Sequence, residues 1–585
     1  IFSLKLPSLI CSKKELIIKS QIIEEIIKRK EVYKKSPSDM VSAYNREIET
    51  EKEYNGRQLL ELLQNADDEN SDEVKIELDT STNQLSIKNR GSECKAFSAK
   101  GIRSLMISNL STKTSKKYIG NKGLGFRSII NWSEDITIRS NDLSIEFSNR
   151  VVHQAFDEMF SIEERVSIRH EQNLPESIYP IPFLSLPEVV DDMDQDWITS
   201  IDITYKTEFL SDIQKQINEL KSEVLLFLNS IKKLTVFIDG KCIKSIEKAE
   251  LHKTWKVHDH RGELPKEFWD KENEAEFFDL KIALQDDLTC DIREVFSYFP
   301  TKLVVDFPFI IHGTFELNSS RNELNDSKKN RFILKELVNL IIDTAKSLTI
   351  GCTSYKAIEL LSYKTPNNIL MELGLYDAID EALNSLSVFP CLDGIYRKKS
   401  DVIFIDSLST FVSSVNQRRL FDNLLIPNDG SVELSGLGLS GNVSTKKLTT
   451  LSKNIESIED RASMIYMFHN TFKHDGKPEF LIDSEGELIS LDDEVYTPSV
   501  IDINVPDYVS IKFIHKELFD ALIKKFEIDS SEKARELQRI LRNITNIQQY
   551  QPTPVLQKII SNANKLIREG IVGDVPKIIE KMVSS

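Results

Sequence analysis

The chain has 585 residues, of which 40% are hydrophobic and 29% charged, and its formal net charge is -17. These proportions are typical of a globular protein of several domains and exclude a chain that is mainly disordered. An acidic balance of this size repels nucleic acid unless a local basic patch offsets it, and no apolar run in the sequence is long enough to span a bilayer.

The cysteine pattern indicates the compartment. None of the six cysteines forms a CxxC pair, which argues against a disulfide framework and against a structural zinc site. No basic segment precedes the apolar stretch at the start of the chain, so we expect no signal peptide. A reducing, cytoplasmic location follows from this pattern.

The N-terminal third divides into two predicted regions. Residues 12–53 are charged and carry an irregular helical stripe of apolar residues, which predicts an N-terminal helical extension over 1–53. From 54 to 207 helical and strand patterns alternate along the chain. Such alternation predicts an α/β domain.

Two hairpins are predicted inside this α/β domain. Residues 74–78 and 85–88 alternate apolar and polar side chains around a turn, and residues 136–139 and 143–147 do the same. Residues 198–205 predict a further strand. These segments supply the strands of one sheet.

A middle domain is predicted over residues 208–350. A single long helix is expected over 208–233, followed by strands near 234–239 and 303–317 and a helix near 330–348. The apolar residues at helical spacing in the first of these helices are Ile213, Ile217, Leu220, Val224 and Leu228.

The last 235 or so residues carry weaker patterns. Turns are predicted at Asp393-Gly394 and at Glu485-Gly486, each between apolar strand-like residues. We therefore expect an α/β domain over 351–529 and a C-terminal helical segment over 530–585.

Residues 57–68, which read RQLLELLQNADD, form the first motif. Glu61, Asn65 and Asp68 recur at i, i+4 and i+7, so they share one face of a helix, opposite a face of leucine and alanine. A carboxylate on such a face can deprotonate water, and an amide oxygen can bind Mg²⁺, which prefers few protein ligands. An amphipathic helix with a solvated polar face accounts for the same pattern, and the segment alone leaves both interpretations open.

Residues 119–128, which read IGNKGLGFRS, form the second motif. Gly120, Gly123 and Gly125 allow backbone conformations in which successive amides cradle phosphates, and a helix that follows adds its N-terminus. The spacing is not that of a P-loop, and alone it is a weak signal for nucleotide binding.

Together the motifs resemble a known family. Glu61-x-x-x-Asn65 on a helix, a strand ending in Asn89-Arg-Gly91, and the glycines at 120–125 stand in the order of the GHKL ATPases. That family shares the Bergerat nucleotide fold and includes the ninety-kilodalton heat-shock chaperones, MutL, histidine kinases and sacsin. Residues 54–68 look most like the sacsin-type branch.

The resemblance implies a fold. We expect a Bergerat two-layer α/β sandwich, with a mixed sheet and helices on one face, over 54–207. An α/β middle domain and a mixed α/β to helical C-terminal region should follow.

The resemblance also implies roles in the binding of Mg-ATP. Glu61 would be the general base, Asn65 the Mg²⁺ ligand, and Asp68 a support for the sugar and adenine side. Gly91 would let the backbone approach the base. Thr199 begins TSIDI, which resembles the strand that closes the pocket behind the adenine.

Further roles fall on the phosphate side. Residues 315–324, FELNSSRNEL, resemble the middle-domain catalytic loop of the chaperones, so Arg321 would reach the γ-phosphate and Asn325 would supply a second polar contact. The residues expected to wrap the phosphates are Gly120, Gly123, Gly125 and Phe126. Ser111 and Lys113 fall in a lid over 108–117. Lys113 either meets a phosphate or remains a solvated lysine, and both interpretations stay open.

One position departs from the family pattern. Asn89 stands where the family carries an aspartate that accepts a hydrogen bond from the adenine amino group. An amide oxygen can still accept that bond, but the charge is lost. Glu93 also replaces the second glycine of this motif.

The resemblance implies an ATPase that works as a nucleotide-driven conformational clamp or chaperone-like switch. ATP and Mg²⁺ are the expected ligands, a protein client or partner subunit the expected partner, and the N-terminal region a site for homodimer formation. Two alternatives remain open: a nucleotide-sensing interaction module with little turnover, and a DNA-linked ATPase of a bacterial anti-phage defence system. No membrane partner is expected.

Overall fold

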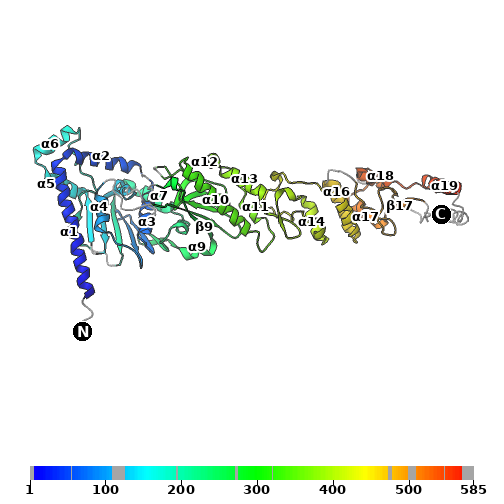
Figure 1. The fold of residues 1–585 in the computed structure, drawn as a ribbon, viewed down its shortest axis with the longest axis horizontal. Coiled ribbons are helices and arrows are strands. Elements are labelled where there is room, and N and C mark those ends of the chain that lie inside the picture. Colours follow the sequence, from blue (N-terminus) through cyan, green and yellow to red (C-terminus); the bar gives the residue numbers. More distant parts are fainter. Residues whose placement is uncertain are drawn as a thin grey trace. The chain divides into compact units, whose positions relative to one another are not determined.

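The computed structural model divides into two compact units, each described separately here (Figure 1). Unit 1 comprises Ile1–Thr344 and Tyr363–Ile379, and unit 2 comprises Ala345–Ser362 and Asp380–Ser585. The structure describes residues 6–53, 56–107, 125–141, 143–192, 196–269, 274–318, 321–471, 477–498, 509–543, 545 and 547–569.

Unit 1 begins with two helices, α1 (Leu6–Lys35) and α2 (Pro37–Glu53), so the extension is helical as predicted. Pro37 lacks a backbone N–H and occupies the first position of α2, where a helix tolerates it. Side chains of these helices form a small core with α5 (Asn149–Met159) and its neighbours. That core includes Tyr33, Met40, Val41, Val152 and Phe156.

An eight-stranded sheet forms the centre of unit 1, in the order β5-β4-β3-β6-β2-β1-β7-β8. Its strands are β1 (Glu73–Asp79), β2 (Gln84–Arg90), β3 (Ser133–Ser140), β4 (Leu143–Ser148), β5 (Glu188–Val189), β6 (Thr199–Tyr205), β7 (Lys233–Ile238) and β8 (Lys241–Glu247). The two predicted hairpins are the antiparallel pairs β1–β2 and β3–β4. Only β1 and β7 pair in parallel, which makes the sheet mixed.

Helices and short turns accompany this sheet. They are α3 (Gln58–Asp68), α4 (Ala99–Met106), η1 (Gly125–Trp132), α6 (Ile162–Glu171), η2 (Thr207–Phe209), α7 (Leu210–Glu219), α8 (Val224–Phe227) and α9 (Lys248–Thr254).

One face of the sheet is buried and the other is polar. In β1, Val74 and Ile76 are fully buried in the core that holds Leu62 of α3, whereas Lys75 and Glu77 point to the opposite face and form an ion pair. A sheet with one buried face needs helices on that face alone. The predicted two-layer α/β sandwich with a mixed sheet is therefore confirmed.

The single long helix predicted over 208–233 is wrong. The chain forms α7 and then the short α8, with Leu220 in an extended conformation between them. Lys221 in the break pairs with Glu294 at 2.6 Å. Leu220, Val224 and Leu228 are all buried, so their spacing reflected burial in the core rather than one continuous helix.

A second sheet, of five strands in the order β12-β11-β13-β10-β9, completes unit 1. Its elements are β9 (Lys256–Glu263), η3 (Lys266–Phe268), β10 (Phe277–Leu284), β11 (Glu294–Ser297), β12 (Phe299–Val304) and β13 (Ile310–Gly313), with α10 (Lys328–Ser347) and α12 (Asn368–Glu372) after them. The single strand predicted near 303–317 is wrong: β12 ends at Val304, the chain leaves the sheet over 305–309, and β13 spans only Ile310–Gly313.

Unit 2 combines short helices with two small sheets, β14-β15 and β17-β16-β18. Its elements, with α13 at the division between the units, are α11 (Lys356–Leu360), α13 (Leu375–Ser385), β14 (Phe389–Pro390), β15 (Tyr396–Arg397), η4 (Lys399–Asp401), α14 (Asp406–Ser414), η5 (Arg418–Phe421), η6 (Ser435–Leu437), α15 (Thr445–Lys453), α16 (Ile458–Thr471), β16 (Glu494–Tyr496), β17 (Ile511–Phe513), α17 (Lys516–Lys525), α18 (Lys533–Ile540), η7 (Leu541–Asn543), β18 (Ile547–Gln548) and α19 (Pro552–Arg568).

The predicted turns of unit 2 are present. Gly394, with φ 85°, turns the chain between β14 and β15, and Gly486, with φ 87°, lies inside a bridge between Ile482 and Leu488. Both glycines need a left-handed backbone that other residues resist. The segment predicted as a helical tail contains the strand β18 as well as α18 and α19.

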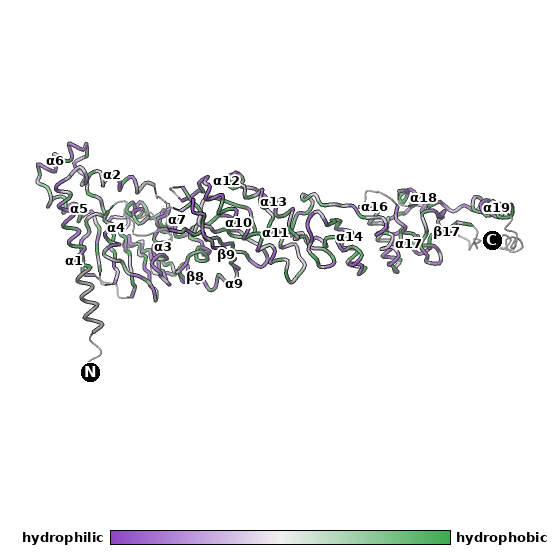
Figure 2. Tube along the Cα trace, in the orientation of Figure 1, coloured by the Kyte–Doolittle hydropathy of each residue, from purple (hydrophilic) through white to green (hydrophobic). Residues whose placement is uncertain are grey.

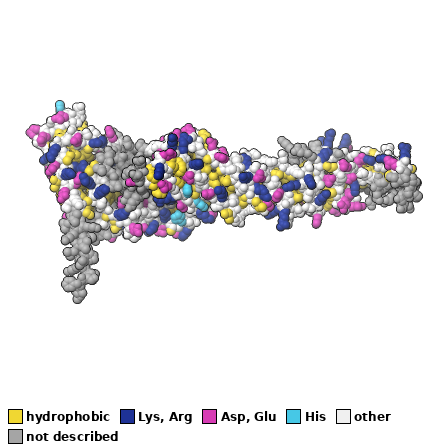
Figure 3. Space-filling model, viewed as in Figure 1, with side chains coloured by type: hydrophobic (Ala, Val, Ile, Leu, Met, Phe, Trp, Pro, Cys, Tyr) yellow, Lys and Arg dark blue, Asp and Glu magenta, His cyan; other side chains and the backbone are white. Residues whose placement is uncertain are grey.

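Hydrophobic and hydrophilic residues are mixed along the traces of both units (Figure 2). Among the described residues, none of the helices has the length and apolar character that crossing a membrane requires. On the face drawn in Figure 3, the described Lys and Arg side chains are interspersed with Asp and Glu. That face therefore presents no broad basic surface within the described part of the chain.

A buried ion pair joins α2 to η1. Glu47 and Arg127 are each 3% exposed, and Arg127 Nη1 lies 2.6 Å from Glu47 Oε1. Glu47 also accepts a hydrogen bond from the backbone of Phe183, and Arg127 donates one to the carbonyl of Leu105. Burial raises the pKa of Glu47 and lowers the pKa of Arg127, because both charges have left water. Each charge therefore depends on its partner.

Replacing Glu47 with glutamine should lower the free energy of unfolding of unit 1 by about 3–5 kcal/mol, because it leaves the charge of Arg127 buried and uncompensated. Urea unfolding followed by tryptophan fluorescence measures this unit alone. All four tryptophans belong to it, namely Trp132, Trp197, Trp255 and Trp269. The matched control is Glu49→Gln, exposed on the same helix, with an expected change below about 0.5 kcal/mol. Equal effects of the two substitutions would contradict the importance of the ion pair.

Candidate functional site

Helix α3 is buried on both of its faces. Leu59, Leu62 and Leu63 pack into the core of the sheet. On the other side Glu61 is 4% exposed and Gln64 is 2% exposed. The alternative of an amphipathic helix with a solvated polar face therefore does not describe α3. Its carboxylate and amide groups are held against other parts of unit 1.

Two sets of hydrogen bonds fix α3 at its ends. Gln216 of α7 accepts a hydrogen bond from the Leu59 N–H at 3.2 Å and donates one to Gln58 at 2.8 Å, which caps the first turn. At the other end, the Asp67 carboxylate accepts N–H bonds from residues 229, 230 and 231 at 2.7–2.9 Å. Asp67 therefore anchors the segment that enters β7. Asp67 was not among the site residues predicted from the sequence, although it stands beside Asp68.

The two residues predicted to be catalytic meet in the structure. Arg321 Nη1 lies 3.0 Å from a carboxylate oxygen of Glu61, and it donates a hydrogen bond of 2.8 Å to Gln64 Oε1. The loop that carries Arg321 is closed by a bond of 2.9 Å from the Arg321 N–H to the Asn318 carbonyl. Arg321 has a φ of 55°, a left-handed conformation that costs a non-glycine residue energy.

Arg57 supports Arg321 from the start of α3. Its Nη1 donates to the carbonyl of Arg321 at 3.2 Å and to that of Pro300 at 3.4 Å. Burial lowers the pKa of Arg57 to about 10, so it is still cationic at neutral pH. Neither Arg57 nor Gln64 was among the site residues predicted from the sequence. Their only signal was their place in the RQLLELLQNADD motif.

Two buried donors beside this pair have no partner among the described residues. They are Arg57 Nε and Gln64 Nε2. Buried donors of this kind are rarely left unsatisfied in a native protein, and bound waters or ions commonly satisfy them. With two guanidinium groups and one amide nearby, the site suits an anion such as a phosphate.

Asn325 forms hydrogen bonds with its own loop and with α10. Its side chain donates to the carbonyl of Leu317 at 3.2 Å, and its carbonyl accepts a bond of 2.8 Å from Asn330. These contacts close the base of the loop that carries Arg321. The structure therefore gives Asn325 a part in shaping the loop, and the second polar contact predicted for it stays a prediction.

On the buried face of the sheet, the last row of side chains at one end of β2, β6 and β3 is polar. Asn89, Thr199 and Ser140 are direct neighbours across β2, β6 and β3, and they are 5%, 4% and 3% exposed. The next row on this face is apolar, with Ile87 and Ile201 paired. The hydroxyls of Thr199 and Ser140 lie 2.9 Å apart. The structure thus brings together Asn89 and Thr199, the two residues predicted to face the base.

Close packing explains why position 91 is a glycine. A Cβ atom there would lie 2.6 Å from the backbone nitrogen of Asp72, which is too close for any side chain. The Asp72 carboxylate accepts a hydrogen bond of 3.0 Å from the Ser92 N–H. Close packing of two backbone segments therefore requires glycine at this position, whether or not a base approaches it.

The glycine-rich motif is described only in part. Gly125 is the first residue of η1, and the side chain of Phe126 is buried in the hydrophobic core rather than turned to a ligand. Gly120, Gly123, Ser111 and Lys113 lie outside the described residues. On α3, Asp68 is 7% exposed, and Asn65 is partly exposed.

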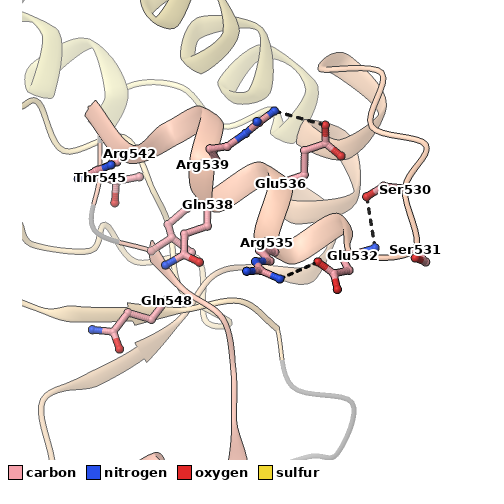
Figure 4. A pocket seen from close by; sticks show the side chains of 11 residues that line it. Ser530, Ser531, Glu532, Arg535, Glu536, Gln538, Arg539, Arg542, Thr545 and Gln548 are labelled. Atoms are coloured by element: carbon pink, nitrogen blue, oxygen red, sulfur yellow. Dashed lines mark hydrogen bonds and ion pairs between the residues drawn. The ribbon is translucent and has the colours of Figure 1, made fainter.

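Other parts of the chain show weaker candidates. Within the described residues, no three His, Cys, Asp or Glu side chains are arranged to hold a metal ion. Unit 2 has a groove of about 930 Å³ beside α18, where Arg535 and Arg539 pair with Glu532 and Glu536 (Figure 4). Its charges are therefore largely compensated. Neither feature assembles a catalytic group comparable with Glu61 and Arg321.

Comparison with known proteins places the sequence near a plant protein. No protein-family model matches the chain. Protein NO VEIN of Arabidopsis thaliana is 27% identical over 319 residues, which cover 49% of this chain and 11% of that protein. The chain thus spans a small part of the length of this curated relative.

Two solved structures align with about half of the chain at low TM-scores. The N-terminal domain of a DNA repair protein aligns with a TM-score of 0.31 and 9% identity, covering 51% of this chain and 96% of that domain. The ATPase and transducer domains of DNA topoisomerase II from Balamuthia mandrillaris align with a TM-score of 0.25 and 13% identity, covering 50% and 66%.

Proposed function

We propose that the chain binds Mg-ATP in a GHKL-type site of unit 1 and hydrolyses it, with Glu61 as the general base. The observation that supports this most is the 3.0 Å contact of Glu61 with Arg321. Two separate motifs predicted that Glu61 and Arg321 act on one phosphate. These motifs lie far apart in the chain, since Arg321 and its other partner Gln64 are separated by 257 positions. Their meeting at a buried site is the arrangement that such a mechanism needs.

Arg321 would exchange partners during the reaction. A guanidinium binds phosphate oxygens through parallel N–H donors, so the γ-phosphate competes with Glu61 for Arg321. When Arg321 turns to the phosphate, the Glu61 carboxylate becomes available to accept a proton from the attacking water. Arg57 Nε and Gln64 Nε2, which have no hydrogen-bond partner among the described residues, would donate to the phosphate or to that water.

The remaining residues would bind the rest of the nucleotide. Asn65 would hold Mg²⁺, which when bound neutralises charge on the phosphates. Asn89 and Thr199 would face the base, and Asp68 would support the sugar side. The expected phosphate contacts are Gly120, Gly123, Gly125 and Lys113.

The simplest test is a pair of measurements on the whole chain. Isothermal titration calorimetry with ATP and Mg²⁺ should show saturable binding, and phosphate release should require Mg²⁺. Absence of binding would overturn the proposal. Binding without phosphate release would support nucleotide binding and overturn the assignment of ATP hydrolysis.

Replacing Asn65 with alanine should weaken Mg-ATP binding by about 10- to 100-fold, the effect of losing an interaction with a charged group worth roughly 1.5–3 kcal/mol. Calorimetry in Mg²⁺ and again in EDTA separates the metal contribution, because the difference between variant and wild type should shrink without metal. Asn45→Ala, at an exposed position of α2, is the matched control. An equal loss in both buffers would mean that Asn65 does not hold the metal.

Turnover would drive a conformational clamp. Binding of ATP would draw Arg321, and with it the second sheet of unit 1, onto the nucleotide, and hydrolysis would release it. A second copy of the chain is the partner we propose for the N-terminal helices. On α1, Ile23 and Ile27 lie one turn apart and are 45% and 54% exposed. A protein client would respond to the state of this clamp.

One observation favours a second candidate function. Arg321 forms an ion pair with a carboxylate oxygen of Glu61, so the proposed base is already paired with a cation. A site in which this pair rarely opens would bind ATP and turn over slowly, as a nucleotide-sensing module does. Single-turnover phosphate release separates the candidates, because the sensing module would release phosphate no faster than a Glu61 variant.

A further inference from the structure

Unit 2 contains the same backbone arrangement twice, over the described residues of 389–440 and of 481–548, which we call the first and the second repeat. Each repeat begins with a hairpin that turns at a glycine, Gly394 in the first and Gly486 in the second, with φ values of 85° and 87°. A central strand follows the hairpin, at Ile403 in the first repeat and at β16 in the second, and it pairs in parallel with a segment on each side. The two repeats therefore share the order and direction of their strands.

Five backbone hydrogen bonds of the first repeat have counterparts in the second. Two close the turn of the hairpin, one joins the hairpin to the second strand, and two pair the central strand with its neighbours. The donor and acceptor residues of the first repeat are Gly394–Cys391, Cys391–Ile395, Ile426–Pro390, Leu425–Ile403 and Phe404–Ser440, and those of the second, in the same order, are Gly486–Asp483, Asp483–Glu487, His515–Ile482, Ile514–Tyr496 and Thr497–Gln548. All of these bonds are 2.9–3.2 Å long. The match of bond to bond indicates one structural unit present twice.

The helix that follows each repeat belongs to the same pattern. α15 comes after the last strand of the first repeat, and α19 after that of the second. When the helices are aligned on these strands, Leu451 of α15 corresponds to Ile559 of α19, and both are buried. Ser452 and Ile560 correspond as well, but Ser452 is 0% exposed and Ile560 is 40% exposed. The burial of Ser452 therefore comes from a contact that has no counterpart at Ile560 among the described residues.

Arg461 of α16 makes this contact. The side chain is 4% exposed, and its Nη1 donates to Ser452 Oγ at 2.7 Å. Its Nη2 donates to the carbonyls of Ser452 and Ile455 at 2.9 and 2.7 Å. Nη1 also donates to the carbonyl of Phe480 at 3.1 Å, directly before the second repeat. Arg461 therefore bonds the helix that follows the first repeat to the chain that enters the second.

The end of α15 compensates the charge of Arg461. Within the described residues no carboxylate pairs with this arginine, and burial lowers its pKa because the charged form has left water. Ser452 lies in the last turn of α15, where the carbonyls carry the negative partial charge of a helix C-terminus. A guanidinium has five N–H donors in a planar fork, so one side chain can bond acceptors on both sides of the junction.

We infer that unit 2 is built from two copies of one structural unit and that Arg461 couples them, so that the repeats open together rather than one at a time. In stacked repeats the stability is the sum of the intrinsic stability of each repeat and the free energy of the interface between neighbours. Arg461 supplies hydrogen bonds at that interface, and side chains from both repeats, such as Leu424 and Val495, share one hydrophobic core. The inference goes beyond the proposed function and does not depend on nucleotide binding.

Hydrogen exchange of the whole chain, measured by mass spectrometry, tests the coupling. In the wild-type chain, the protection factors of the matched amides in the two repeats should agree within about tenfold, since one opening exposes both. Arg461→Met should lower protection in the second repeat by about 10- to 100-fold, the loss of a bond from a charged group. Protection in the first repeat should change by less than about threefold, because the second repeat then opens alone.

Two further variants complete the test. Arg419→Met, at an exposed position of η5 in the first repeat, is the matched control and should leave both repeats unchanged. Ser452→Ala removes one acceptor of Arg461 and should give a smaller loss confined to the second repeat, which keeps the test available if Arg461→Met does not fold.

Three outcomes would overturn the inference. An equal loss of protection in both repeats would mean that Arg461 stabilises a single core and couples nothing. Unchanged protection in Arg461→Met would mean that its bonds do not hold the repeats together. Wild-type repeats that differ in protection by far more than about tenfold would open separately. The proposed function would stand or fall independently, since none of these measurements involves ATP.

Discussion

Replacing Glu61 with glutamine is expected to lower the rate of ATP hydrolysis by about 10²- to 10⁴-fold, the contribution of a positioned general base. Glutamine has nearly the same shape and keeps an oxygen that can accept the hydrogen bond from Arg321. It cannot take a proton from water. The dissociation constant for ATP should therefore stay within about threefold of the wild-type value, which corresponds to less than roughly 0.7 kcal/mol.

Measurement of kcat by phosphate release and of ATP affinity by calorimetry separates these two effects. Glu208→Gln, exposed in η2, serves as the matched control and should change neither value. A Glu61→Gln chain that hydrolyses ATP at the wild-type rate would show that another group acts as the base. Loss of affinity in parallel with kcat would point instead to a site that has lost its structure.

Replacing Arg321 with alanine is expected to reduce kcat by about 10²- to 10³-fold, as the loss of a donor that stabilises transition-state charge does. Binding should change much less, since the base, sugar and metal contacts remain. Arg321→Lys should restore little, because an ammonium on a flexible stem cannot reproduce the bond to Gln64 together with the pairing to a phosphate. The control is Arg331→Ala, where an exposed arginine of α10 pairs with Asp326.

The two substitutions should not be additive. If Arg321 and Glu61 exchange partners in one step, the chain carrying both Glu61→Gln and Arg321→Ala should hydrolyse ATP about as slowly as Glu61→Gln alone. Effects that multiply would mean that the two residues act independently. That result would mean that the contact between Glu61 and Arg321 plays no part in hydrolysis, although each residue could still contribute to kcat.

Much of the architecture of unit 1 could be predicted because local patterns carry it. The hairpins β1–β2 and β3–β4 were visible from strict alternation around short polar turns, and α3 from leucines spaced along one face. The break between α7 and α8 was not, because Leu220 and Val224 are buried on either side of it and keep a helical spacing. A periodicity reports which residues are buried and says less about whether the backbone continues as one helix.

The two residues that meet at the candidate site, Glu61 and Arg321, were predictable from the sequence, whereas the residues that support them were less so. Glu61 and Arg321 stand in motifs that resemble those of one family when they are taken together with the other motifs of the chain. Arg57, Gln64 and Asp67 belong to the same helix motif, yet their roles depend on partners more than 150 positions away, such as the backbone amide of residue 229 at a separation of 162. No local pattern specifies a partner at such a distance.

The sequence by itself determined the hairpins β1–β2 and β3–β4, the polar and apolar faces of α3, and the identity of the groups able to do chemistry. Only the tertiary structure decided that Arg321 lies against Glu61, that Gly91 is required by the Asp72 backbone, and that Arg461 bonds both to Ser452 and to Phe480. The physical reason is that propensity and periodicity act between near neighbours in the chain. Hydrogen bonds, ion pairs and close packing act between whichever groups strand pairing and core burial bring together.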